Sequence, residues 1–334
     1  MDMLSLIGLL ILLYYFIYII SSFVLDCDIA LALKEKFGQP ISSLKDKKVW
    51  IIGASSGIGE ELAYVLADAG CKLILSARRI VELQNVKKKC LELNKNLNDD
   101  DVEVYQLDVL NFDQHKKAFE HVISKFGQLD ILVNNAGRSQ RAQWENIEIN
   151  VDKDMFDLDV FSILSFSRMA VKHFLQVGKG HIVVTSSIAG ICTIPFSASY
   201  CGAKHALHGY FNSLPLEHYD KNIDVTMVCP GPVQTNFLAE CFTDMSGQKY
   251  GVNTAIDHNN KISVKRCAVL MGVAMANKMK EVWITNPSVL QILYAGYCFP
   301  NVMSWFMNQI GAKYLMKLRD TNTNKTYVGE DKKK

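Results

Sequence analysis

The chain has 334 residues, and 49% of them are hydrophobic, which is enough for one large domain or two small ones. Its 36 basic and 34 acidic residues leave a net charge of +2, so it lacks the positive excess that attracts nucleic acid, and no nucleic-acid partner is expected. The nine cysteines show no CxxC or other metal-type spacing, which indicates reduced thiols and no metal site.

An uncharged apolar run begins near the amino terminus. Residues 4–25 contain no charged side chain and include the stretch LLILLYYFIYII. About 20 apolar residues cross a bilayer as a helix, whereas a cleaved signal peptide has a basic start, a shorter apolar core and a small-residue cleavage site. Residues 1–25 are therefore predicted to form a transmembrane anchor rather than a buried helix. The large domain is expected on the cytosolic side, because the positive charges follow the run: Lys34, Lys36, Lys45, Lys47 and Lys48.

Residues 46–285 alternate short apolar strands with helix-length segments. The preceding segment, residues 26–45, is polar and is predicted to be a linker. The strand-like runs are KKVWII, CKLILSA, VEVYQLDV, LDILVNNAG, GHIVVTSS and IDVTMVCPG. Such runs indicate a parallel sheet covered on both faces, so we predict an α/β protein with a Rossmann-type doubly wound sheet in a single domain. The polar stretch 236–265 is predicted to be a loop or lid over a site.

The sequence GASSGIG joins the first of these strands to a helix. In this context Gly53 permits a tight turn, Gly57 lets the backbone approach phosphates, and Gly59 lets helix and strand pack closely. The helix amino terminus offers free N–H groups to a pyrophosphate, although a plain turn is the alternative for such a pattern taken alone. The predicted cofactor contacts in this turn also include Ser55, Ser56 and Ile58.

The end of the second strand reads SARR. An NAD site has an acidic residue near this position for the ribose hydroxyls, whereas Arg78 and Arg79 can bind a 2′-phosphate. The sequence therefore favours NADPH over NADH. Taken alone, the two arginines are also compatible with a solvated surface.

The strongest chemical signal is YCGAK, which places Tyr200 and Lys204 one helical turn apart on the same face. The ammonium is expected to lower the pKa of the phenol from about 10, so that Tyr200 can protonate a carbonyl oxygen while a nicotinamide delivers hydride. Ser187, at the end of HIVVTSS, is expected to hold the same oxygen by a hydrogen bond.

These motifs together resemble the short-chain dehydrogenase/reductase family over roughly residues 46–285. The matching elements, in order, are GASSGIG, Asp108 in QLDV, NNAG at residues 134–137, Ser187, YCGAK, and PGPVQT at residues 230–235. The closer wording, GASSGIGEELAY, LSARR, YCGAKHAL and CPGPVQTN, is similar to the SDR member seven subfamily, whose members are membrane-anchored enzymes.

The resemblance implies further roles near the cofactor. It places Asp108 near the adenine, has Asn135 support the sheet and the cofactor, and assigns the nicotinamide ribose to Lys204. It also places Thr235 near the carboxamide, and Val233 is a further expected cofactor contact.

Two positions depart from the family pattern. Ile52 replaces the usual threonine before the first glycine, so one hydrogen bond near the turn is lost. Asp159, in MFDLDVFSIL, replaces an asparagine that holds a water in a proton relay behind the lysine. Because the carboxylate is charged, it is expected to alter the local pKa balance and the activity.

The carboxyl-terminal segment, residues 286–334, contains the apolar, aromatic stretch 289–307 and a lysine-rich tail. Pro300 and Asn301 interrupt the stretch, which argues against a second membrane span. It is either a helix packed on the domain or an interfacial segment resting on the membrane. The sequon at Asn324 would matter only on the luminal side, and Lys332 resembles a dilysine retrieval signal incompletely.

The residues and the resemblance together predict an endoplasmic-reticulum membrane protein that reduces hydrophobic ketones or aldehydes, such as steroids or retinoids, with NADPH. Two alternatives stay open. The same site could work oxidatively as an alcohol dehydrogenase, or the chain could be a nucleotide-binding membrane scaffold with little turnover, an option that Asp159 keeps open. A homo-oligomer is compatible with the family by analogy alone.

Overall fold

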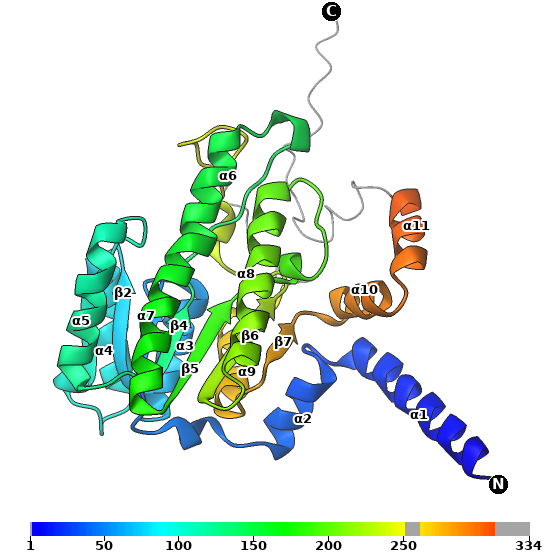
Figure 1. Ribbon diagram of the computed structural model, residues 1–334, viewed down its shortest axis with the longest axis horizontal. Coiled ribbons are helices and arrows are strands. Elements are labelled where there is room, and N and C mark those ends of the chain that lie inside the picture. Colours follow the sequence, from blue (N-terminus) through cyan, green and yellow to red (C-terminus); the bar gives the residue numbers. More distant parts are fainter. Residues whose placement is uncertain (1, 251–260, 311–334) are drawn as a thin grey trace, which may run out of the picture.

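A single parallel sheet organises the chain, and the computed structural model describes residues 2–250 and 261–310 (Figure 1). Seven strands lie in the order β3-β2-β1-β4-β5-β6-β7, and all neighbouring pairs are parallel. This confirms the predicted doubly wound α/β fold. The strands are β1 (Lys48–Ile52), β2 (Lys72–Ala77), β3 (Val102–Gln106), β4 (Ile131–Asn134), β5 (Lys179–Thr185), β6 (Asn222–Pro230) and β7 (Glu281–Ile284).

The strands are apolar throughout because helices cover both faces of the sheet. In β1, Val49 and Ile51 face one core, whereas Trp50 and Ile52 face the other. The first face carries α3 (Gly57–Asp68), α4 (Ile80–Leu93) and α9 (Val264–Ala276), and the second carries α5 (His115–Phe126), α7 (Ser162–Val177) and α8 (Ala198–Glu217).

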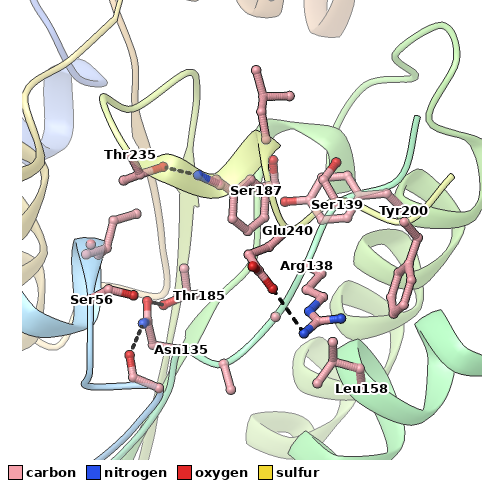
Figure 2. A pocket seen from close by; sticks show the side chains of 18 of the residues that line it. Ser56, Asn135, Arg138, Ser139, Leu158, Thr185, Ser187, Tyr200, Thr235 and Glu240 are labelled. Atoms are coloured by element: carbon pink, nitrogen blue, oxygen red, sulfur yellow. Dashed lines mark hydrogen bonds and ion pairs between the residues drawn. The ribbon is translucent and has the colours of Figure 1, made fainter. Parts of the chain in front are cut away.

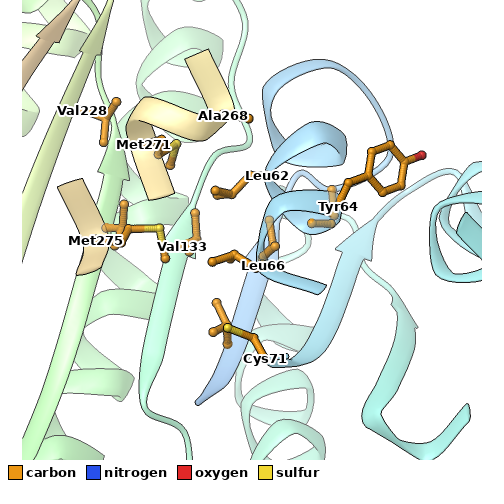
Figure 3. Packing of buried hydrophobic residues seen from close by; sticks show 14 of the residues in the cluster. Leu62, Tyr64, Leu66, Cys71, Val133, Val228, Ala268, Met271 and Met275 are labelled. Carbon is orange, nitrogen blue, oxygen red and sulfur yellow. The ribbon is translucent and has the colours of Figure 1, made fainter. Parts of the chain in front are cut away.

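Each layer is held by the apolar stripe of its helices. On the first face, Leu62 and Leu66 of α3 meet Met271 and Met275 of α9 over the strands (Figure 3). On the second face, α6 (Ile149–Phe156) continues through a π-helical turn (Asp157–Phe161) into α7. This turn brings Asp159 into the buried interior.

The chain reverses direction across the sheet between β1 and β4. From β1 it builds outward to β3 and then crosses to β4 on the other side of β1. Ile52 is in register with both Ser76 of β2 and Asn134 of β4, so the loops that follow these strands leave from the same edge. A crevice at the carboxyl edge of such a switch point is where doubly wound folds bind ligands.

At the amino terminus, α1 (Met3–Val24) is one uninterrupted apolar helix, capped by the Asp2 carboxylate, which accepts a hydrogen bond from Ser5 N at 2.7 Å. Within residues 2–250 and 261–310 it is the one helix long and apolar enough, by length and composition, to cross a membrane.

The range 26–45, where the sequence predicts a polar linker, instead contains α2 (Ile29–Phe37) and a 3-10 turn, η1 (Ile41–Leu44). Leu31 is fully buried, and Arg266 of α9 forms ion pairs with Asp26 and Glu35. The segment is therefore packed on the domain through Leu31 and these ion pairs, whereas Leu33 and Phe37 on the same helix are exposed.

After β7 the chain forms α10 (Pro287–Cys298) and α11 (Pro300–Ile310), which meet at Pro300. Of the predicted lid, residues 236–250 contain η7 (Asn236–Leu238) and a strand-like contact between Phe242 and Gln140, while residues 251–260 lie outside the described part of the chain. The tail with Asn324 and Lys332 also lies outside it. The remaining short turns are η2 (Asp99–Asp101), η3 (Phe112–Gln114), η4 (Trp144–Asn146) and η6 (Ile188–Gly190).

Candidate active site

The candidate site is a cleft at the carboxyl ends of the strands, with a volume of about 1380 Å³ (Figure 2). Its wall is formed by the loops that follow β1, β2, β3, β4, β5 and β6, together with the start of α8. The predicted catalytic and cofactor-binding residues line this cleft except Gly59 and Asp159, which pack against the lining residues Gly53 and Gly137.

The glycine turn is held from below by the neighbouring strand. Gly53 has a φ of +89°, and a Cβ there would stand 2.6 Å from Ala136 N. The space around Gly59 is tighter still, since a Cβ added there would stand 2.2 Å from the carbonyl oxygen of Gly53. The Asn135 side chain donates a hydrogen bond to that same oxygen at 3.0 Å and accepts one from Thr185 Oγ1 at 3.0 Å. Asn135 thus ties the turn to β5.

The helix that follows the turn begins at Gly57 with Ser56 as its cap. Its first N–H groups are left free of intrahelical partners and face the cleft, an arrangement that suits an anion. Arg79 lies beside the start of this helix, because its guanidinium donates hydrogen bonds to Ser55 Oγ at 3.0 Å and to Ser56 Oγ at 2.6 Å. The neighbouring Arg78 is exposed on the same rim.

The remaining expected cofactor contacts lie along the same cleft. Asp108, after β3, is partly buried and accepts a hydrogen bond from Leu110 N at 3.1 Å. Val233 and Thr235, after β6, also line the cleft, and Thr235 is labelled in Figure 2. A Cβ on Gly57 would stand 3.3 Å from Thr235 Cγ2, so the glycine turn and the segment after β6 approach closely at this point.

Tyr200 is buried at the inner end of the cleft, and its phenol hydrogen-bonds Ser187. Ser187 itself follows β5 and caps the short turn η6 by accepting from Ala189 N at 3.1 Å. Burial raises the pKa of the Tyr200 phenol above its usual value, and the carboxylate of Asp159 adds to the rise, while Lys204 and Ser187 act in the opposite direction. The expected lowering of this pKa is therefore wrong for the structure as it stands, because burial outweighs the ammonium.

Lys204 and Asp159 form a buried ion pair behind Tyr200. Their Nζ and Oδ2 atoms are 3.0 Å apart, and the side chains are 4% and 0% exposed, so both charges are out of water. Lys204 also lies 3.2 Å from the carbonyl oxygen of Thr185, and Arg138 N donates to Asp159 Oδ1 at 2.9 Å. These contacts fix the position of the ammonium one turn below the phenol.

Burial disfavours the charged forms of both Lys204 and Asp159, but the attraction between them offsets burial to a different extent for each pKa. Burial lowers the pKa of Lys204, yet the adjacent carboxylate more than offsets this and leaves the pKa above its usual value. Burial also raises the pKa of Asp159, and the attraction of Lys204 offsets only part of that rise. Across their 3.0 Å contact, each charge favours the ionised form of the other.

A second chain of polar contacts, which the sequence did not reveal, runs beside the Lys204–Asp159 pair and is only partly buried, since the side chains of His208 and Glu281 are 13% and 34% exposed. His208, one turn beyond Lys204 on α8, has its Nε2 3.0 Å from Ser186 Oγ and its Nδ1 3.2 Å from Glu281 Oε2. A Cβ on Gly190 would stand 2.8 Å from the imidazole, so the ring is covered. The chain links α8, β5 and β7 next to Ser187. The i, i+4, i+8 spacing of Tyr200, Lys204 and His208 was the available sequence signal.

The outer part of the cleft combines apolar and charged side chains. Ile188, Ile194 and Leu238 contribute apolar side chains to the lining. Arg138 and Glu240, which also line the cleft, form an ion pair at 3.3 Å that is visible in Figure 2 and joins the loop after β4 to the loop after β6.

The fold and the ordered motifs define the chain as a member of the short-chain dehydrogenase family. The sequence model of that family, short chain dehydrogenase, matches residues 47–246. Among curated proteins, the human dehydrogenase/reductase SDR family member 7 is 40% identical over 290 residues, which cover 86% of this chain and 85% of the relative. The mouse protein of the same name is 39% identical over 88% of this chain and 87% of its own. These matches confirm the family and the subfamily resemblance.

A related protein named SDR family protein 7-like in Dictyostelium discoideum is 40% identical over 67% of both chains. Among solved structures, an alcohol dehydrogenase from the archaeon Thermococcus sibiricus complexed with 5-hydroxy-NADP superimposes with a TM-score of 0.61. It covers 72% of this chain and 97% of its own, and its 22% identity supports the common fold.

Proposed function

We propose that this protein is a membrane-anchored, NADPH-dependent reductase of hydrophobic ketones or aldehydes. The observation that carries the proposal is the position of Tyr200. The phenol is buried at the inner end of the cleft, bonded to Ser187 and backed by the Lys204–Asp159 pair, within reach of a turn built for a dinucleotide.

The residues of the cleft fit NADPH. The turn from Gly53 to Gly59 has no space for side chains at its two tightest points, and the helix amino terminus beyond it suits the pyrophosphate. Arg78 and Arg79 would hold the 2′-phosphate, which the archaeal neighbour's bound 5-hydroxy-NADP also carries. Following the family resemblance, Asp108 would lie at the adenine, Asn135 would support the turn, Lys204 would bind the nicotinamide ribose, and Thr235 would lie near the carboxamide, with Val233 as a further cofactor contact.

When bound, the cofactor supplies the hydride that reduces the carbonyl carbon. The chain's own residues manage the oxygen. Ser187 orients it by a hydrogen bond, and Tyr200 donates the proton that converts the developing alkoxide into an alcohol. Lys204 then stabilises the phenolate that remains until a proton is regained from solvent.

The protonation state of Tyr200 favours reduction over the reverse reaction. Reduction requires a protonated phenol at the start, whereas oxidation of an alcohol requires an ionised one. Burial and the Asp159 charge both raise the pKa of this phenol, so the proton donor is the favoured form at neutral pH. The preference for NADPH over NADH supports the same direction. Asp159 would act as a positioning residue for Lys204 through their 3.0 Å contact, which favours an active site over a scaffold role.

The membrane part of the proposal rests on α1, whose side chains are almost all exposed. Such a helix hides its apolar surface in a bilayer, and the lysines that follow it would place the catalytic domain, residues 46–285, in the cytosol. We assign the anchor to the endoplasmic reticulum. A lipid-soluble carbonyl compound would reach the cleft from that membrane, and the apolar side chains at Ile188, Ile194 and Leu238 suit such a substrate.

The test is an assay of the full-length chain in proteoliposomes with a panel of steroid ketones, retinals and quinones. For at least one of them, NADPH consumption should equal alcohol formation, and NADH should support a much lower rate at equal concentration. Tyr200→Phe removes the proton donor and serves as the matched control. If no compound gives product above that control, the reductase assignment is wrong and a nucleotide-binding role replaces it.

A further inference from the structure

The apolar side of α11 faces outward and has no covering element among residues 2–250 and 261–310. Val302, Trp305 and Phe306 are 64%, 64% and 48% exposed, and no residue of this helix is buried. Their i, i+3, i+4 spacing puts them on neighbouring positions of one face. Three polar residues, Asn301, Ser304 and Asn308, lie on another side of the helix, whereas Gln309 lies at the end of the apolar face, one turn beyond Trp305.

The helix before it, α10, is fixed between the domain and the membrane anchor. On one side, the ring of Tyr294 packs against Trp283 of the last strand segment, with centroids 5.4 Å apart. On the other side, the same ring meets Tyr18 of α1 at 5.6 Å, and Gln291 lies 3.5 Å from the carbonyl oxygen of Ser22. Figure 1 shows α1, α10 and α11 together on one flank of the molecule.

This contact sets the depth of α10 in relation to a bilayer. The 22 residues of α1 span about 33 Å at 1.5 Å per residue, close to the roughly 30 Å of the hydrocarbon core. Tyr18, which contacts Tyr294, lies in the half of α1 nearer the domain, about 9 Å from the helix end at Val24. Gln291 contacts Ser22, closer to that end, so α10 meets α1 near the point where α1 leaves the membrane, and α11 follows directly after α10.

We propose that α11 lies in the headgroup region of the bilayer leaflet through which α1 leaves the membrane. Val302 and Phe306 would point toward the acyl chains, with Trp305 at the headgroup boundary. Residues 287–310 contain no Asp, Glu, Lys or Arg, so no charge must be desolvated on insertion. The two sequence-based alternatives thus apply to different helices, since α10 packs on the domain and α11 rests on the lipid. The inference rests on the anchoring role proposed for α1.

The experiment uses the full-length chain in phosphatidylcholine liposomes, with flotation first as the readout of anchoring. Tryptophan emission is then compared between plain liposomes and liposomes brominated near the glycerol end of the acyl chains. The contribution of Trp305 is the difference between wild type and Trp305→Phe. Trp144→Phe is the matched control, because Trp144 is 77% exposed on a loop far from α1 in the chain.

We expect roughly a two-fold loss of the Trp305 component in the brominated liposomes, with a smaller loss when the bromines are near the methyl ends. The Trp144 component should stay unchanged. If the protein floats but the Trp305 component is quenched only by aqueous iodide, or by neither quencher because a second copy covers it, this inference is overturned and the anchor stands. If the protein does not float, the anchor and the inference both fail, whereas the reductase assay is unaffected.

Discussion

Replacing Gly59 with alanine adds one methyl group at the point where the glycine turn and α3 are in closest contact. The new Cβ would stand 2.2 Å from the carbonyl oxygen of Gly53 and 2.6 Å from Asn135 Nδ2. Ordinary contact between such atoms begins near 3.4 Å. The turn must therefore retreat by about 1 Å, and the hydrogen bond from Asn135 that holds it must lengthen.

The matched control is Gly209→Ala, in another helix of the same protein. A Cβ there meets nothing within 4 Å, so the substitution should gain about 1 kcal/mol from helix propensity alone. Gly59→Ala has the same gain but also overpacks the core, which costs about 1–3 kcal/mol or more. Given a backbone atom at 2.2 Å, we expect the two variants to differ by about 3 kcal/mol in free energy of unfolding.

Urea unfolding of both variants in detergent micelles, followed by NADPH titration of the folded proteins, measures the two consequences. Gly59→Ala should unfold at a lower urea concentration than Gly209→Ala. Its Kd for NADPH should rise by about ten-fold or more, because a displaced turn no longer fits the pyrophosphate. If the two variants unfold at the same urea concentration and bind NADPH with the same Kd, the close approach at Gly59 does not shape the cofactor site.

Three further predictions concern the rest of the site. Asp159→Asn removes a charge that raises the pKa of Tyr200 and of Lys204. In the pH profile of kcat/KM for reduction, the alkaline limb should therefore move to lower pH, and a limb that does not move would contradict this. The double variant Arg78→Ala/Arg79→Ala should raise the Kd for NADPH about 100-fold and that for NADH only slightly, whereas an equal loss for both would argue against 2′-phosphate binding. His208→Leu should lower the free energy of unfolding by about 1–3 kcal/mol, because Ser186 and Glu281 lose their partner. His205 is exposed on the same helix, so the control His205→Leu should change the free energy of unfolding by no more than about 0.5 kcal/mol.

Local sequence patterns sufficed for the sheet and for the edge where the site lies. Short apolar runs such as KVWII, alternating with helix-length segments, indicate strands covered on both faces, and glycines at fixed offsets after the first run mark the turn. The helix α2 was not foreseen, because nine residues with three lysine or glutamate side chains give a weak pattern, and its stability comes from Leu31 and the ion pairs of Arg266.

The electrostatics of the site could not be obtained from spacing alone. Tyr200 and Lys204 are neighbours in any helix, but the direction of the phenol's pKa depends on how deeply the helix is buried and on which charge lies behind it. The carboxylate that lies 3.0 Å from Lys204 belongs to Asp159, 45 residues earlier in the chain, on a π-helical turn that no periodicity predicts. The same holds for the contact of His208 with Glu281, since these residues meet only after β7 has joined the sheet.

The role of Tyr200 as proton donor is tested most directly by a single-turnover measurement. Wild type and Tyr200→Phe are loaded with NADPH to equal occupancy, mixed with a substrate identified in the panel, and followed by loss of NADPH absorbance. We predict that the two proteins bind the cofactor equally, and that the variant transfers hydride about 10²- to 10⁴-fold more slowly because the oxygen receives no proton. Equal transfer rates at equal occupancy would show that the proton comes from elsewhere and would contradict the proposed mechanism.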